Sequence, residues 1–293
     1  MAPYCKRLTY VTLGSLVLSL SVGTAQLIPG AQERREAARE LYPDLSQKLE
    51  NPLARILVLP TTFTYEEGSG VEERGSRFET NFAPQVPFIL GNDWHVLSKT
   101  DISWIHQDNV ISSDTQEGWS DLKQTFFFTP KRSMGWDSYW GVGPTIVLPT
   151  GSEDGLTTDK VSAGPTIAVY RQKDGWTKGI LLSHVWSFEG DSDAEDVSFS
   201  RMEPRLTYTF NTGTTVGIDA EFQHNWERNA WVAPVRIGIG QLTLIRKHPV
   251  KFAIAYKHYL LDDNNAAEWG VDFRVTVPME APSWGFFKKE SNW

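Results

Sequence analysis

Cysteine is nearly absent from this chain of 293 residues, which contains one, Cys5. It lies in a leading segment, residues 1–25, that has the features of a secretory signal peptide: two basic residues, an apolar stretch over 8–22 and small residues at 23–25. A retained membrane anchor is the alternative for this segment. Cleavage after residue 25 would leave a chain without cysteine, which excludes a disulfide scaffold and a thiolate metal site.

Long apolar runs and an excess of positive charge are also lacking. Beyond residue 25 no apolar run is long enough for a transmembrane helix, and the mean hydropathy is -0.34. The net charge of -8 argues against a nucleic-acid partner. The polar average does not exclude a membrane β-barrel, because only alternate residues of each strand face lipid in such a fold.

Alternation of apolar and polar residues dominates the rest of the chain. Twelve alternating runs are separated by clusters of Gly, Asp, Asn and Pro, and they cover 55–66, 76–89, 94–106, 119–129, 138–149, 160–171, 176–188, 198–210, 214–226, 231–241, 250–261 and 268–278. The runs exceed the usual five or six residues of strands in globular sheets. Their length suits a tilted crossing of a bilayer.

The stretch WHVLSKTDISW (94–104) illustrates the choice between two kinds of sheet. Trp94 and Trp104 share one face with apolar residues, and Lys99 and Asp101 share the other. A soluble sheet would bury the first face and wet the second, whereas a membrane barrel would turn the first to lipid and the second to a polar lumen. The two tryptophans are separated by roughly 33 Å of extended chain, or about 25 Å after barrel tilt, which matches the apolar band between aromatic girdles.

The connections between the runs favour the barrel. Every other connection is longer and acidic, at 66–75, 107–118, 150–159, 189–196 and 262–267, and the intervening ones are shorter or basic, at 91–93, 130–133, 171–175, 211–213 and 246–249. Such alternation is typical of an up-and-down barrel with short periplasmic turns and long outer loops. The sequence therefore predicts an all-β fold, an up-and-down antiparallel transmembrane β-barrel of about twelve strands.

The parity of the runs predicts which side chains face the lumen and which face lipid. The expected lumen-lining ions are Arg77, Glu79, Lys99, Asp101, Asp121, Lys123, Arg201, Glu203, Arg205, Asp219, Glu221, Arg236, Lys251, Lys257, Asp272 and Arg274. The expected lipid-interface aromatics are Phe78, Phe88, Trp94, Trp104, Trp176 and Trp186. Two interpretations of the lumenal ions stay open: a permeation path, or a cross-strand salt-bridge network that fills a narrow barrel. Gly141, Gly143 and Gly164 share the inward parity, and we expect them to make room in a crowded lumen.

The segments on either side of the runs differ from the barrel. Residues 26–54 begin with a charged stretch rich in Ala, Glu and Arg, which predicts a short helix that ends at Pro43, followed by the linker SQKLENPLA in the periplasm or the lumen. The barrel is expected over 55–278 and a C-terminal tail over 279–293. Trp293 lies outside an alternating run, so the sequence does not identify the closing strand.

The histidines raise the alternatives of a lipid hydrolase and a metal site. Ser183 and His184 are neighbours, but adjacent strand residues point to opposite faces and cannot form a catalytic pair. His184 shares the outward parity of Trp186, and membrane-embedded barrel lipases carry out catalysis on that face. His95, His106, His224 and His258 lie near strand ends, and the sequence predicts no catalytic residue, metal or cofactor.

Several stretches together resemble a family of bacterial outer-membrane barrel proteins, the phenol-degradation MetA-pathway family, whose members are usually described as transporters. The stretches are NPLARILVLP (51–60), GWSDLKQTFFFTPK (118–131), WGVGPTIVLPTG (140–151), SAGPTIAVYRQ (162–172), GILLSHVWSFEGD (179–191) and EWGVDFRVTV (268–277). The resemblance implies an outer-membrane barrel with a transport role, and it transfers no catalytic or binding residue by position.

The main hypothesis is a passive channel for small solutes, aromatic or anionic ones included, in the bacterial outer membrane after signal-dependent export. Its expected partners are outer-membrane lipid and a small-molecule solute, without nucleic acid, and the oligomeric state is not predicted. A non-conducting structural or adhesive barrel is the alternative. A barrel lipid hydrolase and a soluble secreted β protein are further alternatives.

Overall fold

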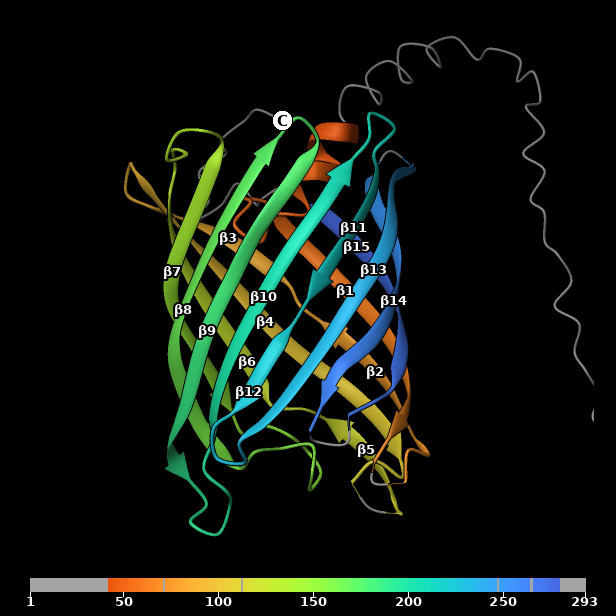
Figure 1. Ribbon diagram of the computed structural model, residues 1–293. Coiled ribbons are helices and arrows are strands. Elements are labelled where there is room, and N and C mark those ends of the chain that lie inside the picture. The colour runs from red at the N-terminus through yellow and green to blue at the C-terminus, as the bar shows by residue number, and fades with distance from the viewer. Residues whose placement is uncertain (1–41, 71, 112, 247, 264–265, 280–293) are drawn as a thin grey trace, which may run out of the picture.

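The computed structural model describes residues 42–70, 72–111, 113–246, 248–263 and 266–279. These residues form one antiparallel β-sheet that closes on itself as a barrel (Figure 1). The strands are β1 (Leu57–Ser69), β2 (Gly75–Phe82), β3 (Gln85–Leu90), β4 (Trp94–Asp108), β5 (Thr115–Trp119), β6 (Leu122–Pro130), β7 (Ser138–Leu148), β8 (Lys160–Lys173), β9 (Trp176–Gly190), β10 (Ser198–Thr209), β11 (Thr214–Ala220), β12 (Phe222–Asn225), β13 (Ala230–Ile245), β14 (His248–Asp262) and β15 (Trp269–Met279).

Twelve crossings make the barrel wall, which confirms the predicted fold. Among the fifteen strand segments, β2 with β3, β5 with β6, and β11 with β12 each form one crossing divided by a short break. The barrel closes where β15 pairs with β1, from Leu57 opposite Met279 to Glu67 opposite Trp269. β15 is therefore the closing strand. The predicted signal peptide and all but the first residue of the predicted tail lie outside the described residues.

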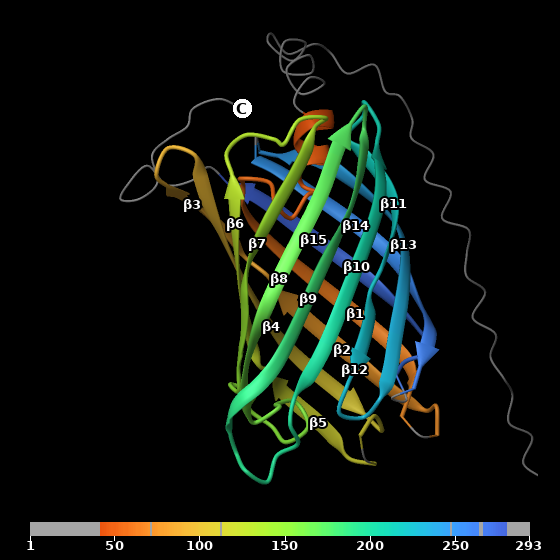
Figure 2. The ribbon, with the colours of Figure 1, turned by 60° about the vertical axis from the view of Figure 1, so that its left-hand side comes forward.

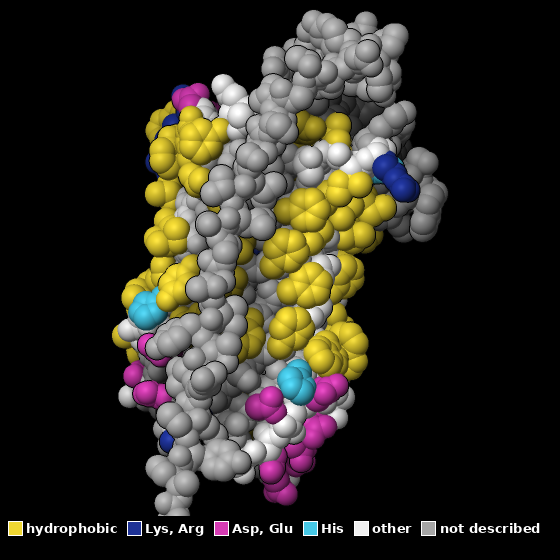
Figure 3. Space-filling model, turned by 90° about the vertical axis from the view of Figure 1, so that its right-hand side faces the viewer, with side chains coloured by type: hydrophobic (Ala, Val, Ile, Leu, Met, Phe, Trp, Pro, Cys, Tyr) yellow, Lys and Arg dark blue, Asp and Glu magenta, His cyan; other side chains and the backbone are white. Residues whose placement is uncertain are grey.

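Burial along β4 follows the alternation of the sequence. His95, Leu97 and Ser103 are buried, whereas Trp94 is exposed on the opposite face. On other strands too, apolar side chains of the outer face are exposed, and they cover much of the barrel wall (Figure 3). A soluble protein seldom exposes so much contiguous apolar surface, and a lipid environment is suited to it.

Contacts between connections define two ends of the barrel. The acidic connections meet at one end, where Asp191 N donates a hydrogen bond to Asp159 O at 3.0 Å and Arg228 pairs with Glu195. The hydrogen bond from Arg228 holds the pKa of the Glu195 carboxyl below its usual value. Acidic side chains gather below the apolar wall in Figure 3. The opposite end carries the short helix over residues 42–48 (Figure 2).

Residues 46–48, which were expected in a linker, belong to this helix. The helix predicted before Pro43 lies outside the described residues except for its last two, and Pro43 is in the first turn of the described helix, where proline is tolerated. Leu45 and Ser46 are buried against the barrel interior, and this packing holds the helix in place. None of the helices among the described residues is long and apolar enough to cross a membrane.

Candidate functional site in the barrel lumen

A cluster of ions around Arg236 lies at the centre of the lumen wall. Arg236 Nη1 is 2.6 Å from Asp219 Oδ2, its Nη2 is 3.5 Å from Glu221 Oε2, and its Nε is 3.3 Å from Asp272 Oδ2. Since β14 separates β13 from β15 in the sheet, the contact between Arg236 and Asp272 requires both side chains to face inward. The alternating sequence pattern thus brings ions from non-neighbouring strands together.

Most other inward ions are paired in the same way. The pairs are Lys257–Glu66 at 2.5 Å, Arg201–Glu221 at 3.0 Å, Arg77–Glu79 at 3.0 Å, Lys99–Asp101 at 3.4 Å and Lys123–Asp101 at 3.7 Å. Glu66 is an addition to the expected set, because residue 66 was placed both at the end of the run over 55–66 and at the start of the connection over 66–75 and was not counted among the lumenal ions. It lies in β1 and continues the inward series of Thr62 and Thr64, a period-2 signal.

Three expected lumen residues have no such partner in the described part of the chain. Arg205 Nη1 donates to the Glu50 backbone oxygen at 3.4 Å, and Arg274 Nε donates to Thr62 Oγ1 at 3.0 Å. No carboxylate oxygen of the described residues lies within 4.0 Å of either guanidinium. Glu203, two positions before Arg205 on β10, has no ion-pair partner there either.

Asp121 has a different role from the one expected. It lies in the break between β5 and β6, and its carboxylate accepts hydrogen bonds from Gly151 N at 3.0 Å and Thr158 N at 2.8 Å. Asp121 therefore holds the connection over 150–159 in place. The break turns this side chain away from the series of lumenal ions that its parity predicted.

Residues 42–56 bring contacts into the lumen that the sequence analysis did not anticipate. Lys251 Nζ lies 2.5 Å from Glu50 Oε1, 3.0 Å from Ser46 Oγ and 2.9 Å from Thr215 Oγ1. Burial raises the pKa of Glu50, but the charges of Lys251 and Arg205 outweigh that effect and leave the pKa below its usual value. Lys251, predicted to line the lumen, therefore anchors the N-terminal segment.

An apolar contact holds the same segment on the other side of the lumen. Leu53 is buried together with Leu97, Phe127 and Tyr170. A Cβ atom added to Gly141 would lie 2.8 Å from Leu53 Cδ2. Gly141 thus makes room in the lumen, as expected, and Leu53 occupies that room.

Gly143 and Gly164 lack side chains for another reason. A Cβ atom at Gly143 would overlap the carbonyl oxygen of Phe126, and one at Gly164 would overlap that of His184. These oxygens belong to the neighbouring strands β6 and β9. The two glycines therefore let adjacent strands approach each other, which corrects the expectation that they make lumenal space.

The six aromatics expected at the lipid interface lie on the outward face of their strands. Phe78, Trp94, Trp176 and Trp186 are exposed, and Phe88 and Trp104 are half-buried. Several contact other rings near the barrel ends, such as Trp94 with Trp140 at 5.8 Å and Trp176 with Tyr208 at 4.9 Å between ring centroids. Aromatic side chains at these levels are typical of the girdles of membrane barrels.

His184 also lies on the outer wall, and its partner is Ser200 of β10. His184 Nδ1 is 2.9 Å from Ser200 Oγ, and Trp226 Nε1 donates to the same oxygen at 2.9 Å. Among the described residues no hydrogen bond is found at the other ring nitrogen, so the pair lacks the third residue that orients a catalytic histidine. Sequence reasoning missed Ser200 because the contact depends on the register of two strands. The described residues also hold no cluster of ligands suited to a metal ion.

Comparisons with known proteins find likeness in shape and none in sequence. No protein-family model matches the chain, and no curated protein matches it. A crystal structure described as an outer membrane channel from Pseudomonas putida F1 has a TM-score of 0.64 and 10% identity, covering 78% of this chain and 99% of that one.

Two further solved structures are less similar. The NanC porin has a TM-score of 0.45 and 15% identity over 75% of this chain and 98% of its own. Outer membrane phospholipase A from Escherichia coli has a TM-score of 0.47 and 13% identity over 75% of this chain and 92% of its own. Scores at this level carry no argument. The chain therefore shares its fold with a bacterial outer membrane channel, and the comparisons give no support to the narrower MetA-pathway label.

Proposed function

We propose that this protein is an outer-membrane β-barrel that acts as a passive channel for small solutes. The observation that carries the proposal is the division of side chains by the barrel wall, with exposed apolar residues outside and ions such as Arg236 and Asp272 inside. Such a wall is stable in a bilayer and encloses a polar interior. The fold shared with an outer membrane channel supports the same conclusion.

The proposed path passes between the lumenal ions and residues 42–56, which narrow it. Lys99 and Lys123 share the single carboxylate of Asp101, and Arg205 and Arg274 lack a carboxylate partner among the described residues. Among the inward ions described above, with Glu50 and Glu66 included and Asp121 left out, nine are cations and eight are acids. A positive field in a narrow pore favours anionic or polar aromatic solutes over cations.

A non-conducting structural or adhesive barrel is the second candidate, and the Arg236 cluster favours it. Three carboxylates surround this one guanidinium. Paired ions that cross a narrow lumen brace the wall and leave little room for a solute.

Single-channel recording on the full chain in planar bilayers distinguishes the two candidates. We expect small, discrete conductance steps from the wild type and larger steps from Leu53→Ala. The substitution removes packing against Leu97 and Phe127, a loss of about 2–5 kcal/mol for a buried leucine, and so loosens the segment that narrows the path.

Lys48→Ala is the matched control for this experiment. Lys48 lies in the same segment, but its Nζ pairs with Asp44 on the surface, so its loss should leave the conductance unchanged. Silent bilayers with both wild type and Leu53→Ala, from protein that is folded by its gel mobility, would establish the non-conducting barrel instead.

A further inference from the structure

A groove of about 1020 Å³ runs over the outer wall of the barrel. Its floor is made of small side chains, with Pro144 on β7 and Ala163 and Pro165 on β8. Pro144 lies directly opposite Pro165 in the register of these strands. The hollow exists because two neighbouring strands carry short outward side chains at the same level.

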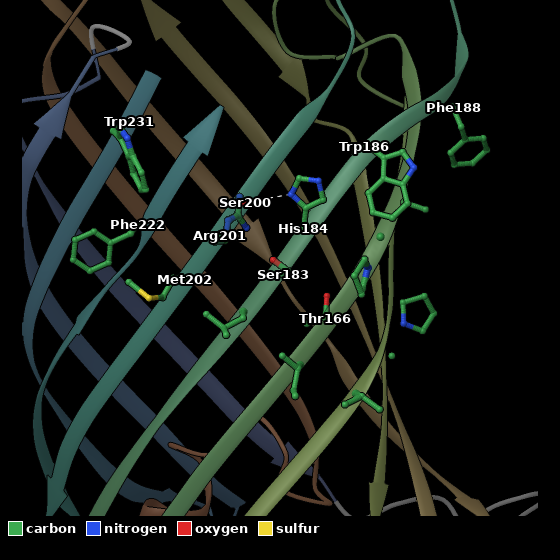
Figure 4. A pocket seen from close by; sticks show the side chains of 18 residues that line it. Thr166, Ser183, His184, Trp186, Phe188, Ser200, Arg201, Met202, Phe222 and Trp231 are labelled. Carbon is green, nitrogen blue, oxygen red and sulfur yellow. Dashed lines mark hydrogen bonds between the residues drawn. The ribbon is translucent and has the colours of Figure 1, made fainter. Parts of the chain in front are cut away.

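Large side chains form the sides of the groove. Trp186 and Phe188 lie on one side, and Met202, Phe222 and Trp231 lie on the other (Figure 4). These bulky residues of β9 and of β10, β12 and β13 stand beside the small-residue floor on β7 and β8. It is lined almost entirely by apolar groups.

One polar cluster interrupts this lining, at the groove end near the acidic connections. Ser200 Oγ accepts a hydrogen bond from Trp226 Nε1 at 2.9 Å, and it lies 2.9 Å from His184 Nδ1 (Figure 4). His224 is opposite Ser200 in the neighbouring strand, with its ring centroid 4.5 Å from that of Trp231. His224 Nδ1 is buried and has no hydrogen-bond partner among the described residues.

The hydrogen bonds of this cluster direct a donor toward the groove. Ser200 Oγ accepts the indole N–H and shares one further hydrogen bond with His184 Nδ1, in which either group can donate. One donor hydrogen of the cluster is then left over, on His184 Nε2 when Ser200 donates and on Ser200 Oγ when a neutral His184 donates. An apolar groove at the level of the tryptophans thus presents a hydrogen-bond donor to whatever occupies it, and the fitting partner is an acceptor such as a carbonyl oxygen.

We propose that this groove binds one membrane lipid, with an acyl chain along the small-residue floor and its ester carbonyl at the His184–Ser200–Trp226 cluster. The apolar floor suits the chain. The donor lies at the boundary where tryptophan rings mark the membrane interface, which is the level of the ester groups of a bilayer.

A second groove on the same wall provides an internal comparison. Its volume is about 730 Å³, and its lining includes Leu206, Ile218, Ile237 and Ile254 but no histidine or serine. Its lining includes the single donors of Trp176, Tyr208 and Tyr256, but no histidine, serine and indole joined by hydrogen bonds as in the first groove. The proposed lipid is held at the first groove because that groove combines an apolar floor with a donor whose position is fixed by such a cluster.

The test uses the full chain in phosphatidylcholine vesicles that contain phosphatidylethanolamine with a photoreactive diazirine in one acyl chain. After irradiation and digestion, mass spectrometry locates the labelled peptides. We expect labelling over residues 163–167 and 200–202 to exceed labelling over 237–239, which line the second groove. Equal labelling of the two grooves would overturn the proposal.

Two variants and a control sharpen the result. Ser200→Ala and His184→Phe each remove the ordered donor, and we expect labelling of the first groove to fall about fivefold, which corresponds to about 1 kcal/mol. Ser98→Ala is the matched control, since Ser98 is an outward serine on β4 that bonds to Gln124 at 2.9 Å, and it should label like the wild type.

Ala163→Trp fills the floor and should abolish labelling there while the barrel still shows its normal gel mobility. Unchanged labelling in all three groove variants would also overturn the proposal. Conductance measured on the same Ser200→Ala protein should equal that of the wild type. Failure of the lipid proposal can therefore be distinguished from failure of the channel proposal.

Discussion

Gly164 sets the spacing between β8 and β9. A Cβ atom added at Gly164 would overlap the carbonyl oxygen of His184. This backbone carbonyl cannot move aside as a flexible side chain can. The position therefore tolerates only glycine without a shift of one strand. The same argument holds for Gly143 beside Phe126.

Gly164→Ala should lower the free energy of unfolding by roughly 1–3 kcal/mol, the usual cost of overpacking. Reversible urea unfolding in lipid vesicles measures this difference. Ala163→Val is the control, because it adds methyl groups one position away, on the outward face where the groove leaves room. Equal stability of Gly164→Ala and the wild type would show that the strands can separate at no cost.

The unpaired cations of the lumen lead to a prediction about selectivity. Neither Arg205 nor Arg274 has a carboxylate partner within 4.0 Å among the described residues, whereas the Arg236 guanidinium contacts three carboxylates. Replacing both Arg205 and Arg274 by glutamine should reduce the preference for anions, measured as a shift in reversal potential across a salt gradient. Arg74→Gln, on an exposed outer connection, should leave the potential unchanged.

At the scale of elements, the N-terminal segment depends on the barrel for its position. Lys251 holds Glu50 and Ser46, and Leu53 packs in an apolar cluster. These contacts lie at the end of the barrel that carries the turn before β11, since Ser46 Oγ donates to Gly213 O at 2.9 Å. The attachment of residues 42–56 to the lumen can therefore be tested without changing the strands of the barrel wall.

Lys251→Met should release residues 42–56, because it leaves the buried Glu50 without its cation. Removing one partner of a buried pair costs about 3–5 kcal/mol. Limited proteolysis or hydrogen exchange of the folded barrel would detect the released segment. The double variant Lys251→Met with Glu50→Gln removes both charges and should recover much of the protection, and no recovery would mean that the ion pair is not the anchor.

The same anchor should respond to pH. The pKa of folded Glu50 lies below its ordinary value of 4.5, so its stabilising effect is complete above that value and is lost as the pH falls through the folded pKa. Acid should therefore lower the hydrogen-exchange protection factors of residues 42–56 in the wild type, that is, the observed rates corrected for the intrinsic rate at each pH. The Glu50→Gln variant should show no such dependence at these residues.

At the scale of the whole molecule, the two ends of the barrel have opposite character. Acidic connections such as 107–118 and 189–196 lie at one end, and the helix over 42–48 lies at the other (Figure 1). Long outer loops and short periplasmic turns characterise outer-membrane barrels. The expected orientation places the acidic end outside the cell.

Epitope tags test this orientation. A tag inserted in 107–118 or in 189–196 should be reached by antibody on intact cells, and a tag in 171–175 should be reached only after the outer membrane is permeabilised. Gln47 Nε2 donates to Trp176 O at 3.0 Å. The turn over 171–175 therefore lies at the end of the barrel that carries the helix, and a tag in it tests where that end is. Labelling in the reverse pattern would invert the topology.

The sequence alone determined the wall of this barrel. Strict alternation assigns each residue of a strand to one face, because successive side chains point in opposite directions. This local rule was enough to predict that Lys99 and Asp101 lie inside the barrel and that Trp94 lies outside. The twelve crossings and the acidic connections could also be predicted from the runs and the segments between them. The rule failed where a strand was broken, as at Asp121, and it was not applied to Glu66, the last residue of its expected run.

Only the tertiary structure decided which side chains meet. Ser200 faces His184 because of the register between β9 and β10, and Arg236 reaches Asp272 because the sheet curves into a closed lumen. Residues 42–56 enter that lumen through contacts with Lys251 and Leu97, which are far away in sequence. Register, curvature and long-range packing are properties of the closed sheet, and no periodicity within one strand encodes them.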